Sequence, residues 1–343
     1  MLKNTNILEI GIPTYNRSDQ LKKCLNSILI SLEGLSPEDR KLIGIAISNN
    51  STKDIMNRNN IISIFEHKFK ESGIGYFSHH ITGYNIGMVN NMSSVYINSK
   101  SDYIWSLGDD DIMRFDALIT VLNAIKLYKP CFIAGGWLQK SKVGYYDDQI
   151  KNDDQSDNEI YKVLNGEDKL NTFLLKNTVQ QQEYIYKTSQ LKTFFEKDDN
   201  IQFLTEMQPG LLAIYCMQDK GPLILLKNSA GIFRHDEPDS NSAWRHLWLR
   251  FALQDWPSLS EKIHKLKWLN KYQYSLSIGI WRNLLFTAAP CRPDIFLGIN
   301  RKYDLSPFKL FYFHRFIYLK ALLASISSIF FRIINLLKFK FNK

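Results

Sequence analysis

Three adjacent carboxylates, Asp109, Asp110 and Asp111, are the strongest chemical signal in this sequence. They follow directly after the apolar run Tyr103–Leu107 and one glycine. Adjacent carboxylates repel one another, so at the end of a buried strand a cation or hydrogen-bond donors must offset their charge. Hard divalent ions such as Mg²⁺ or Mn²⁺ prefer oxygen ligands and pair with phosphates. The run therefore predicts a metal site, and a solvated acidic turn before the next helix is the alternative.

The geometry of this run depends on the backbone. In an extended segment alternate residues share a face, so Asp109 and Asp111 would point one way and Asp110 the other. We therefore expect Asp109 and Asp111 to be metal ligands.

Other polar clusters also follow apolar runs. The run 7–13 predicts a buried first strand, and Thr14-Tyr15-Asn16-Arg17 comes after it. The run Leu42–Ile47 predicts a second strand, followed by Ser48-Asn49-Asn50-Ser51-Thr52. Strands and helices alternate through the first ~110 residues, which favours a mostly parallel sheet whose ligands bind beyond the carboxyl ends of the strands. The fold class is therefore α/β.

The elements that must position these clusters follow from apolar spacing. We expect a helix after the first strand, capped by Ser18 or Asp19, with Leu21, Cys24, Leu25, Ile28 and Leu32 on its apolar face. Further strands are expected at 74–80, 103–107, 132–138 and 223–226, and further helices at 89–98, 117–127 and around 211–215. Residues 141–158 are polar and predict a long loop.

Composition limits the class of protein. The 343 residues are 45% hydrophobic and 22% charged, which excludes a disordered or fibrous chain and allows two domains or one large domain with an appendage. Cys24, Cys131, Cys216 and Cys291 lie far apart, so neither a disulfide framework nor a zinc knuckle is indicated. The N-terminus lacks the layout of a secretory signal, and we expect a cytosolic protein.

Four ordered motifs carry a resemblance to a known family. They are Ile12-Pro13-Thr14-Tyr15-Asn16-Arg17, Ile47-Ser48-Asn49-Asn50-Ser51, the pattern Asn85-x-Gly87-x-x-x-Asn91, and Tyr103 to Asp111. Together they resemble family-2 glycosyltransferases of the GT-A fold, in particular the abequosyltransferase-like group that builds bacterial surface polysaccharides such as lipopolysaccharide. The resemblance covers residues 7–125 well, 126–260 loosely and the tail hardly at all.

The resemblance implies a mechanism and a set of site residues. A nucleotide-sugar lies across the strand ends, Mn²⁺ or Mg²⁺ bridges its diphosphate, and an acceptor hydroxyl displaces the nucleotide with inversion. The metal would act as a Lewis acid and would be held by Asp109, Asp111 and His235. The residues implied to contact the nucleotide-sugar are Pro13, Thr14, Tyr15, Asn16, Arg17, Asn49, Asn85, Gly87, Asn91, Asp109, Asp110, Arg234 and Arg245.

Two positions depart from the family pattern. Asn49 stands where the family commonly has Asp, so it is compatible with uracil, thymine or cytosine, and a simple Asx turn is the alternative. Glu206 is the expected general base, but the usual Glu-Asp pair is here Glu206-Met207. A helix-start carboxylate is the other interpretation of Glu206, and Asp236 or Glu237 is the next candidate base.

The segment from Arg234 to Arg245 is unusually polar. Arg234, His235 and Arg245 flank a loop that could close over the diphosphate and offset negative charge. His235 could serve as a metal ligand through a neutral ring nitrogen, and a simply solvated histidine is the alternative.

The last part of the chain is basic and amphipathic. The formal net charge is +9, and residues 305–343 contribute seven Lys or Arg and no acid. The longest uncharged stretch, Ala321–Phe331, is shorter than the ~20 residues that a spanning helix needs. We expect residues 308–343 to form a helical tail on the inner face of the cell membrane, where anionic lipid attracts it. Packing on another protein surface is the alternative, and nucleic acid binding is not indicated.

These observations predict three parts. Residues 1–260 form a GT-A glycosyltransferase domain, with a nucleotide-sugar half (1–125) and an acceptor half (126–260). A helical extension, 261–307, and the basic tail, 308–343, follow. We expect a metal-dependent inverting transferase for a hexosyl or deoxyhexosyl group, acting on a saccharide acceptor that is lipid-linked. The alternative is a membrane-attached scaffold that keeps the nucleotide-binding fold without turnover.

Overall fold

A computed structural model provides the structure of the chain. It describes residues 6–51, 55–135, 138–139, 161–175, 184–197, 208–226, 232–234 and 256–273. The chain divides into two compact units, one formed by residues 1–172 and 178–235 and the other by 173–177 and 236–343. The first unit holds both sheets, and α11 (Trp256–Lys265) belongs to the second.

The central sheet has eight strands in the order β3-β2-β1-β4-β9-β6-β10-β8. Their bounds are β1 Leu8–Thr14, β2 Ile43–Asn49, β3 Tyr76–Ile81, β4 Tyr103–Ser106, β6 Phe132–Ala134, β8 Tyr161–Leu164, β9 Tyr184–Lys187 and β10 Leu223–Leu226. Strands β3, β2, β1 and β4 are parallel neighbours, whereas β9 and β8 run antiparallel to the strands beside them. The predicted mostly parallel sheet is confirmed.

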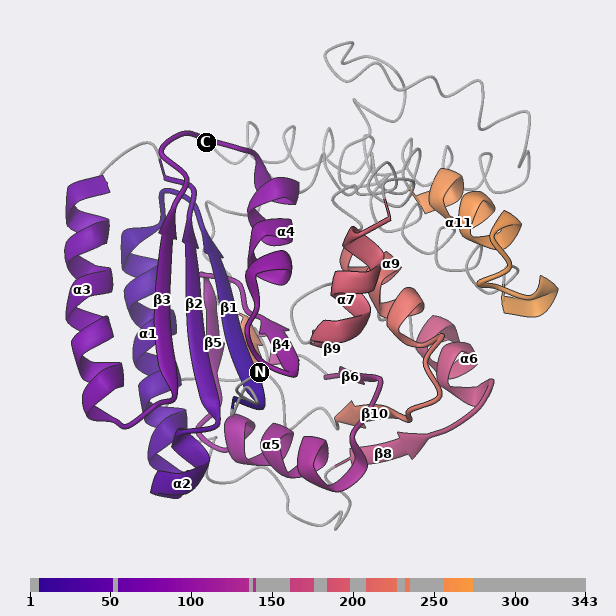
Figure 1. Ribbon diagram of the computed structural model, residues 1–343, viewed down its shortest axis with the longest axis horizontal. Coiled ribbons are helices and arrows are strands. Elements are labelled where there is room, and N and C mark those ends of the chain that lie inside the picture. Colours follow the sequence, from indigo (N-terminus) through magenta and orange to yellow (C-terminus); the bar gives the residue numbers. More distant parts are fainter. Residues whose placement is uncertain are drawn as a thin grey trace, which may run out of the picture. The chain divides into compact units, whose positions relative to one another are not determined.

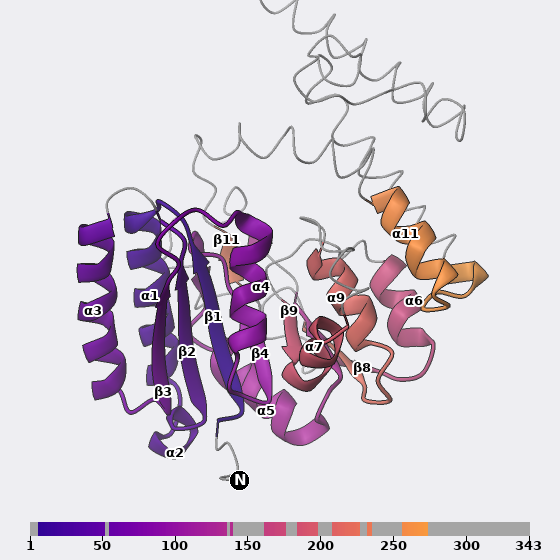
Figure 2. The ribbon, with the colours of Figure 1, turned by 45° about the horizontal axis from the view of Figure 1, so that its top comes forward.

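Helices cover both faces of this sheet, as predicted. Helices α1 and α3 lie on one side of strands β1 to β3, and α4 lies on the other (Figures 1 and 2). The helices that accompany the sheet span these residues: α1 Ser18–Glu33, α2 Pro37–Arg40, α3 Ile55–Glu71, α4 Met88–Asn98, α5 Ala117–Tyr128, α6 Asp168–Leu175, α7 Thr188–Phe195 and α9 Gln208–Cys216.

The alternation of side chains in β1 explains how it sits between two helical layers. Leu8, Ile10 and Ile12 are fully buried in the main apolar core, and each such side chain contributes roughly 1.5–3 kcal/mol by leaving water. Gly11 faces the other way, where a Cβ atom would lie 2.1 Å from Cγ1 of Val95 on α4. Only glycine lets α4 approach β1 this closely, which brings α4 to the carboxyl end of β1.

A second, three-stranded sheet connects a distant segment to the acidic run. It consists of β5 (Asp111–Met113), β11 (Ile232–Arg234) and β7 (Leu138–Gln139), in the order β5-β11-β7. Strand β11 runs antiparallel to β5 and places Arg234 opposite Asp111. The expected single strand over 132–138 is therefore wrong: the chain leaves the central sheet after Ala134 and resumes in this smaller sheet.

Several other expectations differ in detail. The prediction that Ser18 or Asp19 caps the first helix is wrong, because Arg17 occupies the cap position without a side-chain cap bond. Helix α3 was not expected, although Ile62, Phe65 and Phe69 are buried on it. The predicted loop at 141–158 and the predicted tail at 308–343 lie outside the described residues. Within those residues, no helix has both the length and the apolar character that a membrane crossing requires.

Candidate active site

The carboxyl ends of three parallel strands bring the predicted polar clusters together. Thr14 at the end of β1 pairs in register with Asn49 at the end of β2. Strand β4 lies on the other side of β1, where the backbone N–H of Leu107 donates to the carbonyl of Gly11 at 2.9 Å. The acidic residues after β4 therefore face the loop after β1, as the parallel arrangement requires.

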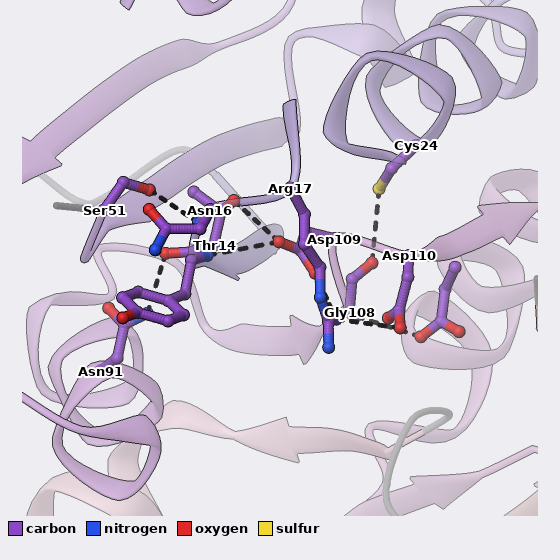
Figure 3. A network of polar contacts seen from close by, with 11 residues as sticks. Thr14, Asn16, Arg17, Cys24, Ser51, Asn91, Gly108, Asp109 and Asp110 are labelled. Atoms are coloured by element: carbon purple, nitrogen blue, oxygen red, sulfur yellow. Dashed lines mark hydrogen bonds and ion pairs between the residues drawn. The ribbon is translucent and has the colours of Figure 1, made fainter. Parts of the chain in front are cut away.

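Asp109 is the centre of a network of hydrogen bonds and ion pairs at the carboxyl ends of these strands (Figure 3). Its Oδ2 accepts a hydrogen bond from Oγ1 of Thr14 at 2.8 Å and a longer one from the backbone N–H of Tyr15 at 3.4 Å. Its Oδ1 accepts from Nη1 of Arg17 at 3.0 Å. The residue is only 4% exposed. One buried carboxylate thus fixes the whole loop that follows β1.

Arg17 bridges two of the three carboxylates. The same Nη1 atom that reaches Asp109 also donates to Oδ2 of Asp110 at 2.9 Å. The net pKa of Asp109 is raised to about 6. Burial is the largest cause of the rise, the charge of Arg17 opposes it, and the charge of Asp110 adds to it. A cation or hydrogen-bond donors must offset the repulsion between these carboxylates. Arg17 supplies one such positive charge from within the chain, and Asp111 lies outside this bridge.

The acidic run is a turn and not an extended segment. Strand β4 ends at Ser106, and the backbone N–H of Asp111 donates to the carbonyl of Gly108 at 3.1 Å. The expected alternation is therefore wrong: Asp109 and Asp110 bind the same arginine, while Oδ2 of Asp111 accepts from the N–H of Gly108 at 3.2 Å. A Cβ atom at Gly108 would lie 2.6 Å from that oxygen, so any other residue here would displace the Asp111 side chain.

The loop after β1 has a fixed backbone. Asn16 adopts φ 53°, a left-handed conformation that asparagine tolerates better than most residues. Its backbone N–H donates to Oγ of Ser51 at 3.1 Å, and the N–H of Asn50 donates to the carbonyl of Thr14 at 3.0 Å. Tyr15 is 42% exposed. The loop therefore presents an aromatic side chain to solvent from a rigid backbone.

Asn49 is held by the protein itself. Its Oδ1 accepts from the backbone N–H of Ser51 at 3.1 Å, and its Nδ2 donates to Oδ1 of Asn59 at 3.2 Å. The first of these bonds forms an Asx turn, which was the alternative to base recognition by Asn49. Because Asn49 is 1% exposed, base recognition by this residue stays a prediction.

Asn50 connects the site to the glycine turn before α4. It donates through Nδ2 to Oδ1 of Asn85 at 2.9 Å and accepts at Oδ1 from the N–H of Ile86 at 2.8 Å. Asn85 in turn accepts from the N–H of Gly87 at 2.9 Å. Gly87 has φ 81°, which explains glycine at this position. Asn50 was not singled out by sequence reasoning, although its adjacency to Asn49 was a usable signal.

Asn91 ties α4 to the strand ends. Its Nδ2 donates to the carbonyl of Thr14 at 3.3 Å, and its Oδ1 accepts from Oγ of Ser48 at 2.6 Å. Cys24 on α1 secures the other side of the site, because its thiol donates to the carbonyl of Gly108 at 3.5 Å. Burial raises the pKa of Cys24 well above its usual value, so the thiol remains protonated. Neither Ser48 nor Cys24 was predicted as a site residue.

Other predicted site residues fall elsewhere. Arg234 lies in β11, at the register position opposite Asp111. Pro13 is in β1, one residue before Thr14. Glu206, His235 and Arg245 lie outside the described residues.

The carboxylates of the turn suit a divalent metal only in one binding mode. Within the described part of the chain, no three His, Cys, Asp or Glu side chains gather in a group that could hold a metal ion. Mg²⁺ is commonly held by one or two carboxylates together with substrate phosphates. The hard oxygen donors of Asp109, Asp110 and Asp111 fit that mode, in which the substrate completes the coordination.

Comparison with known proteins identifies the fold. No protein-family model and no curated protein matches the chain. Among solved structures, S. aureus TarS 1-349 is similar with a TM-score of 0.53 at 13% identity, over 94% of this chain and 80% of that one. The mannosyltransferase PcManGT from Pyrobaculum calidifontis, in complex with GDP-Man and Mn²⁺, is similar with a TM-score of 0.51 at 10% identity, over 95% and 88%. This chain has a GT-A glycosyltransferase fold.

The expected fold class is thus confirmed. A structure of TarS 1-349 in complex with UDP-GlcNAc is also similar, with a TM-score of 0.50 at 14% identity over 94% of this chain and 89% of that one. At these identities the likeness concerns the GT-A fold alone, and it does not reach the abequosyltransferase-like group.

Proposed function

We propose that this GT-A protein transfers a sugar from a nucleoside diphosphate donor to a saccharide acceptor. The observation that carries the proposal is the buried contact between the acidic turn and the loop after β1, centred on Asp109 and Thr14. This contact lies at the carboxyl edge of a parallel sheet, where ligands bind in α/β folds. Solved neighbours of the same fold hold UDP-GlcNAc, or GDP-Man with Mn²⁺.

The donor diphosphate would lie over the acidic turn. The carboxylates that would hold Mn²⁺ or Mg²⁺ there are Asp111 and Asp109, with His235 as a further ligand. When bound, the metal would supply Lewis-acid stabilisation of the leaving diphosphate. Both oxygens of Asp109 already accept hydrogen bonds within the chain. We assign Asp111 and Asp109 as the metal ligands of the chain, and Asp109 also orients Arg17 and Thr14.

The nucleoside would be held beside the loop after β1. The exposed ring of Tyr15 offers a stacking surface on a fixed backbone, and Asn49, Asn85, Gly87 and Asn91 shape the turns next to it. Pro13 sets the strand exit, and Asn16 holds the turn. Arg234, Arg245 and Asp110 complete the set that we assign to the donor. The register of Arg234 opposite Asp111 supports that assignment for one of the three.

The transfer would invert the configuration at the anomeric carbon, with Glu206 accepting the proton of the acceptor hydroxyl. We expect Glu206→Gln to reduce turnover by about 10²-fold or more with unchanged donor affinity. Glu196→Gln is a matched control, because Glu196 is an exposed carboxylate after α7. Normal turnover in Glu206→Gln would reassign the base to Asp236 or Glu237.

The cellular setting that we propose is the inner face of the membrane. The basic tail, 308–343, would hold the enzyme near a lipid-linked acceptor of surface polysaccharide synthesis, while residues 1–260 form the catalytic domain and 261–307 the helical extension. Removing residues 308–343 should release the protein from phosphatidylglycerol vesicles in a sedimentation assay. Retained binding would contradict this role of the tail.

The function itself is tested with a donor panel. Each of several UDP-, GDP-, CDP- and dTDP-sugars is added with Mn²⁺, and the melting temperature is recorded. A donor that binds the native state alone raises it by mass action. We expect one class of donor to stabilise the protein and to be consumed when a saccharide acceptor is present. A protein that no donor stabilises would contradict the proposed function.

A further inference from the structure

A pocket lies at the amino ends of strands β1 and β4, whereas the candidate active site lies at their carboxyl ends. It measures about 630 Å³ and is lined by Ile7 before β1, by Asp102 and Tyr103 at the start of β4, and by the junction of β9 and α7. Strand β1 has seven residues, so its two ends are ~20 Å apart at ~3.3 Å per residue. The pocket is therefore separate from the acidic turn.

Five lysines line this pocket, which we call the lysine pocket: Lys100, Lys126, Lys129, Lys187 and Lys192. Two of them have partners elsewhere, since Lys126 pairs with Asp39 and Lys187 pairs with Oδ2 of Asp219 at 3.0 Å. Across the described ranges, Lys100, Lys129 and Lys192 form no ion pair. Asp102 is the carboxylate residue in the lining, so positive charge predominates.

A buried neighbour offsets this charge only in part. Glu9 on β1 is 1% exposed, and its Oε2 accepts a hydrogen bond from the backbone N–H of Lys100 at 3.1 Å. Burial raises the pKa of Glu9 to about 7, against the lowering effect of the Lys100 and Lys192 charges. Burial thus favours the uncharged form of Glu9. The pocket therefore retains most of its positive charge.

The start of α7 adds hydrogen-bond donors to the same pocket. Lys187 occupies the cap position without a side-chain cap bond, and the N–H of Thr188 donates to the carbonyl of Asp102 at 2.8 Å. The next N–H groups, of Ser189 and Gln190, have no acceptor within the helix. Such helix starts favour anions.

The hydroxyl group of Thr188 is independent evidence that the pocket binds a ligand. It lines the pocket and is 3% exposed. Within the described residues, its Oγ1 has no hydrogen-bond partner. A buried hydroxyl without a partner costs free energy unless a ligand or water satisfies it. The lysines, the open helix start and this hydroxyl meet at one place.

We propose that the lysine pocket binds a phosphate group that carries at least two negative charges. Several ammonium groups around a helix start match the charge and the many acceptor oxygens of such a group. A carboxylate has two oxygens and one charge, so it would leave most of these donors unsatisfied. The phosphate can be free, attached to a carbohydrate, or part of a lipid headgroup. This site is additional to the donor site of the proposed transferase.

The test measures pyrophosphate binding by isothermal titration calorimetry at constant ionic strength. EDTA is present, because the diphosphate site at the acidic turn is proposed to need a divalent ion. The pocket variant combines Lys100→Gln, Lys129→Asn and Lys192→Gln, with Asn chosen because residue 129 has φ 46°. We expect this variant to bind pyrophosphate with an affinity that is lower by about tenfold or more than that of the native protein.

Two controls make the result specific. The variant Lys22→Gln, Lys23→Gln, Lys68→Gln removes the same charge from α1 and α3 and should bind like the native protein. Thr188→Val keeps the side-chain volume and removes the hydroxyl, and should weaken binding about threefold. No binding at millimolar pyrophosphate, or equal weakening in the pocket variant and the lysine control, would overturn the proposal.

A second arm identifies the source of the phosphate. Native protein, pocket variant and lysine control are sedimented with vesicles of phosphatidic acid, whose phosphomonoester carries up to two negative charges, and with vesicles of phosphatidylcholine. Weaker binding of the pocket variant alone to phosphatidic acid assigns the site to a lipid headgroup. Equal vesicle binding, together with the loss of pyrophosphate binding, assigns it to a free or carbohydrate-linked phosphate.

Discussion

The two ends of strands β1 and β4 differ in how their charges are arranged. At the carboxyl end, Asp109 is buried, and both of its oxygens accept hydrogen bonds from the loop after β1. At the amino end, Lys100, Lys129 and Lys192 are exposed and, among the described residues, form no ion pair. The first arrangement is complete within the chain, whereas at the second buried Glu9 and Asp102 offset the lysine charge only in part. The difference fits the proposed donor site at the carboxyl end of the strands and the proposed phosphate site at their amino end.

The largest expected effect comes from removing the central charge of the acidic edge. Asp109→Asn removes the charge that Thr14 and Arg17 contact and leaves Arg17 paired with Asp110 alone, so the loop after β1 loses its main anchor. We expect turnover to fall by about 10³-fold, as when a preorganised charge is removed from an active site. Steady-state kinetics with the stabilising donor measure this. Asp19→Asn, which changes an exposed carboxylate on α1, should retain activity.

Arg17→Gln tests whether the ion pairs of Arg17 with Asp109 and Asp110 hold the acidic turn in place. The change leaves Asp109 and Asp110 without their shared cation, and we expect a loss of about 1–2 kcal/mol of unfolding free energy at pH 8. Arg17 lowers the pKa of Asp109, so its removal should raise that pKa further. The acidic limb of the pH-activity profile should then move to higher pH. An unchanged limb and unchanged stability would mean that the bridge has no role in solution.

At the amino ends of the strands we expect a gain of stability instead of a loss. The pKa of Glu9 is raised from 4.5 to about 7, so its ionised form destabilises the fold. This contribution is absent at low pH and grows as the pH rises through about 5 to 7. Glu9→Gln should therefore increase the unfolding free energy at pH 8 by about 1–3 kcal/mol and change little at pH 4.5. Chemical denaturation at the two pH values measures this.

Glu66→Gln serves as the control for that measurement. Glu66 is a carboxylate on α3 that pairs with Lys70 at the surface. Its replacement should alter stability by less than about 0.5 kcal/mol at either pH. A pH dependence in Glu9→Gln equal to that of the native protein would show that Glu9 is not the titrating group.

The positions of the strands and of the acidic edge followed from the sequence, because each buried strand is an apolar run that ends in polar residues. Strand β1, for example, differs from the predicted 7–13 by one residue at each end. The partner of Asp109 did not follow, since Arg17 lies 92 residues away and only the parallel pairing of β1 with β4 brings it close. The lysine pocket was equally hidden, because its five lysines come from three segments that are far apart in the sequence, at residues 100, 126–129 and 187–192.

Short strands were also beyond sequence reasoning. Strand β9 has four residues and inserts antiparallel between β4 and β6. Its apolar run Tyr184–Tyr186 is too brief to distinguish a strand from part of a helix. Helix α3 carries apolar residues on more than one face, with Ile64 exposed beside the buried Ile62 and Phe65, which weakens its amphipathic signal.

In the proposed transferase, the acidic turn binds a donor diphosphate through a divalent cation. The most direct test is calorimetric titration of the stabilising donor into native protein and into Asp111→Asn, each with Mn²⁺ and with EDTA. We predict that the native protein binds the donor in a Mn²⁺-dependent manner. The affinity of Asp111→Asn for the donor should be lower by about tenfold or more and should not change with Mn²⁺. Equal Mn²⁺-dependent affinity in the two proteins would contradict the claim.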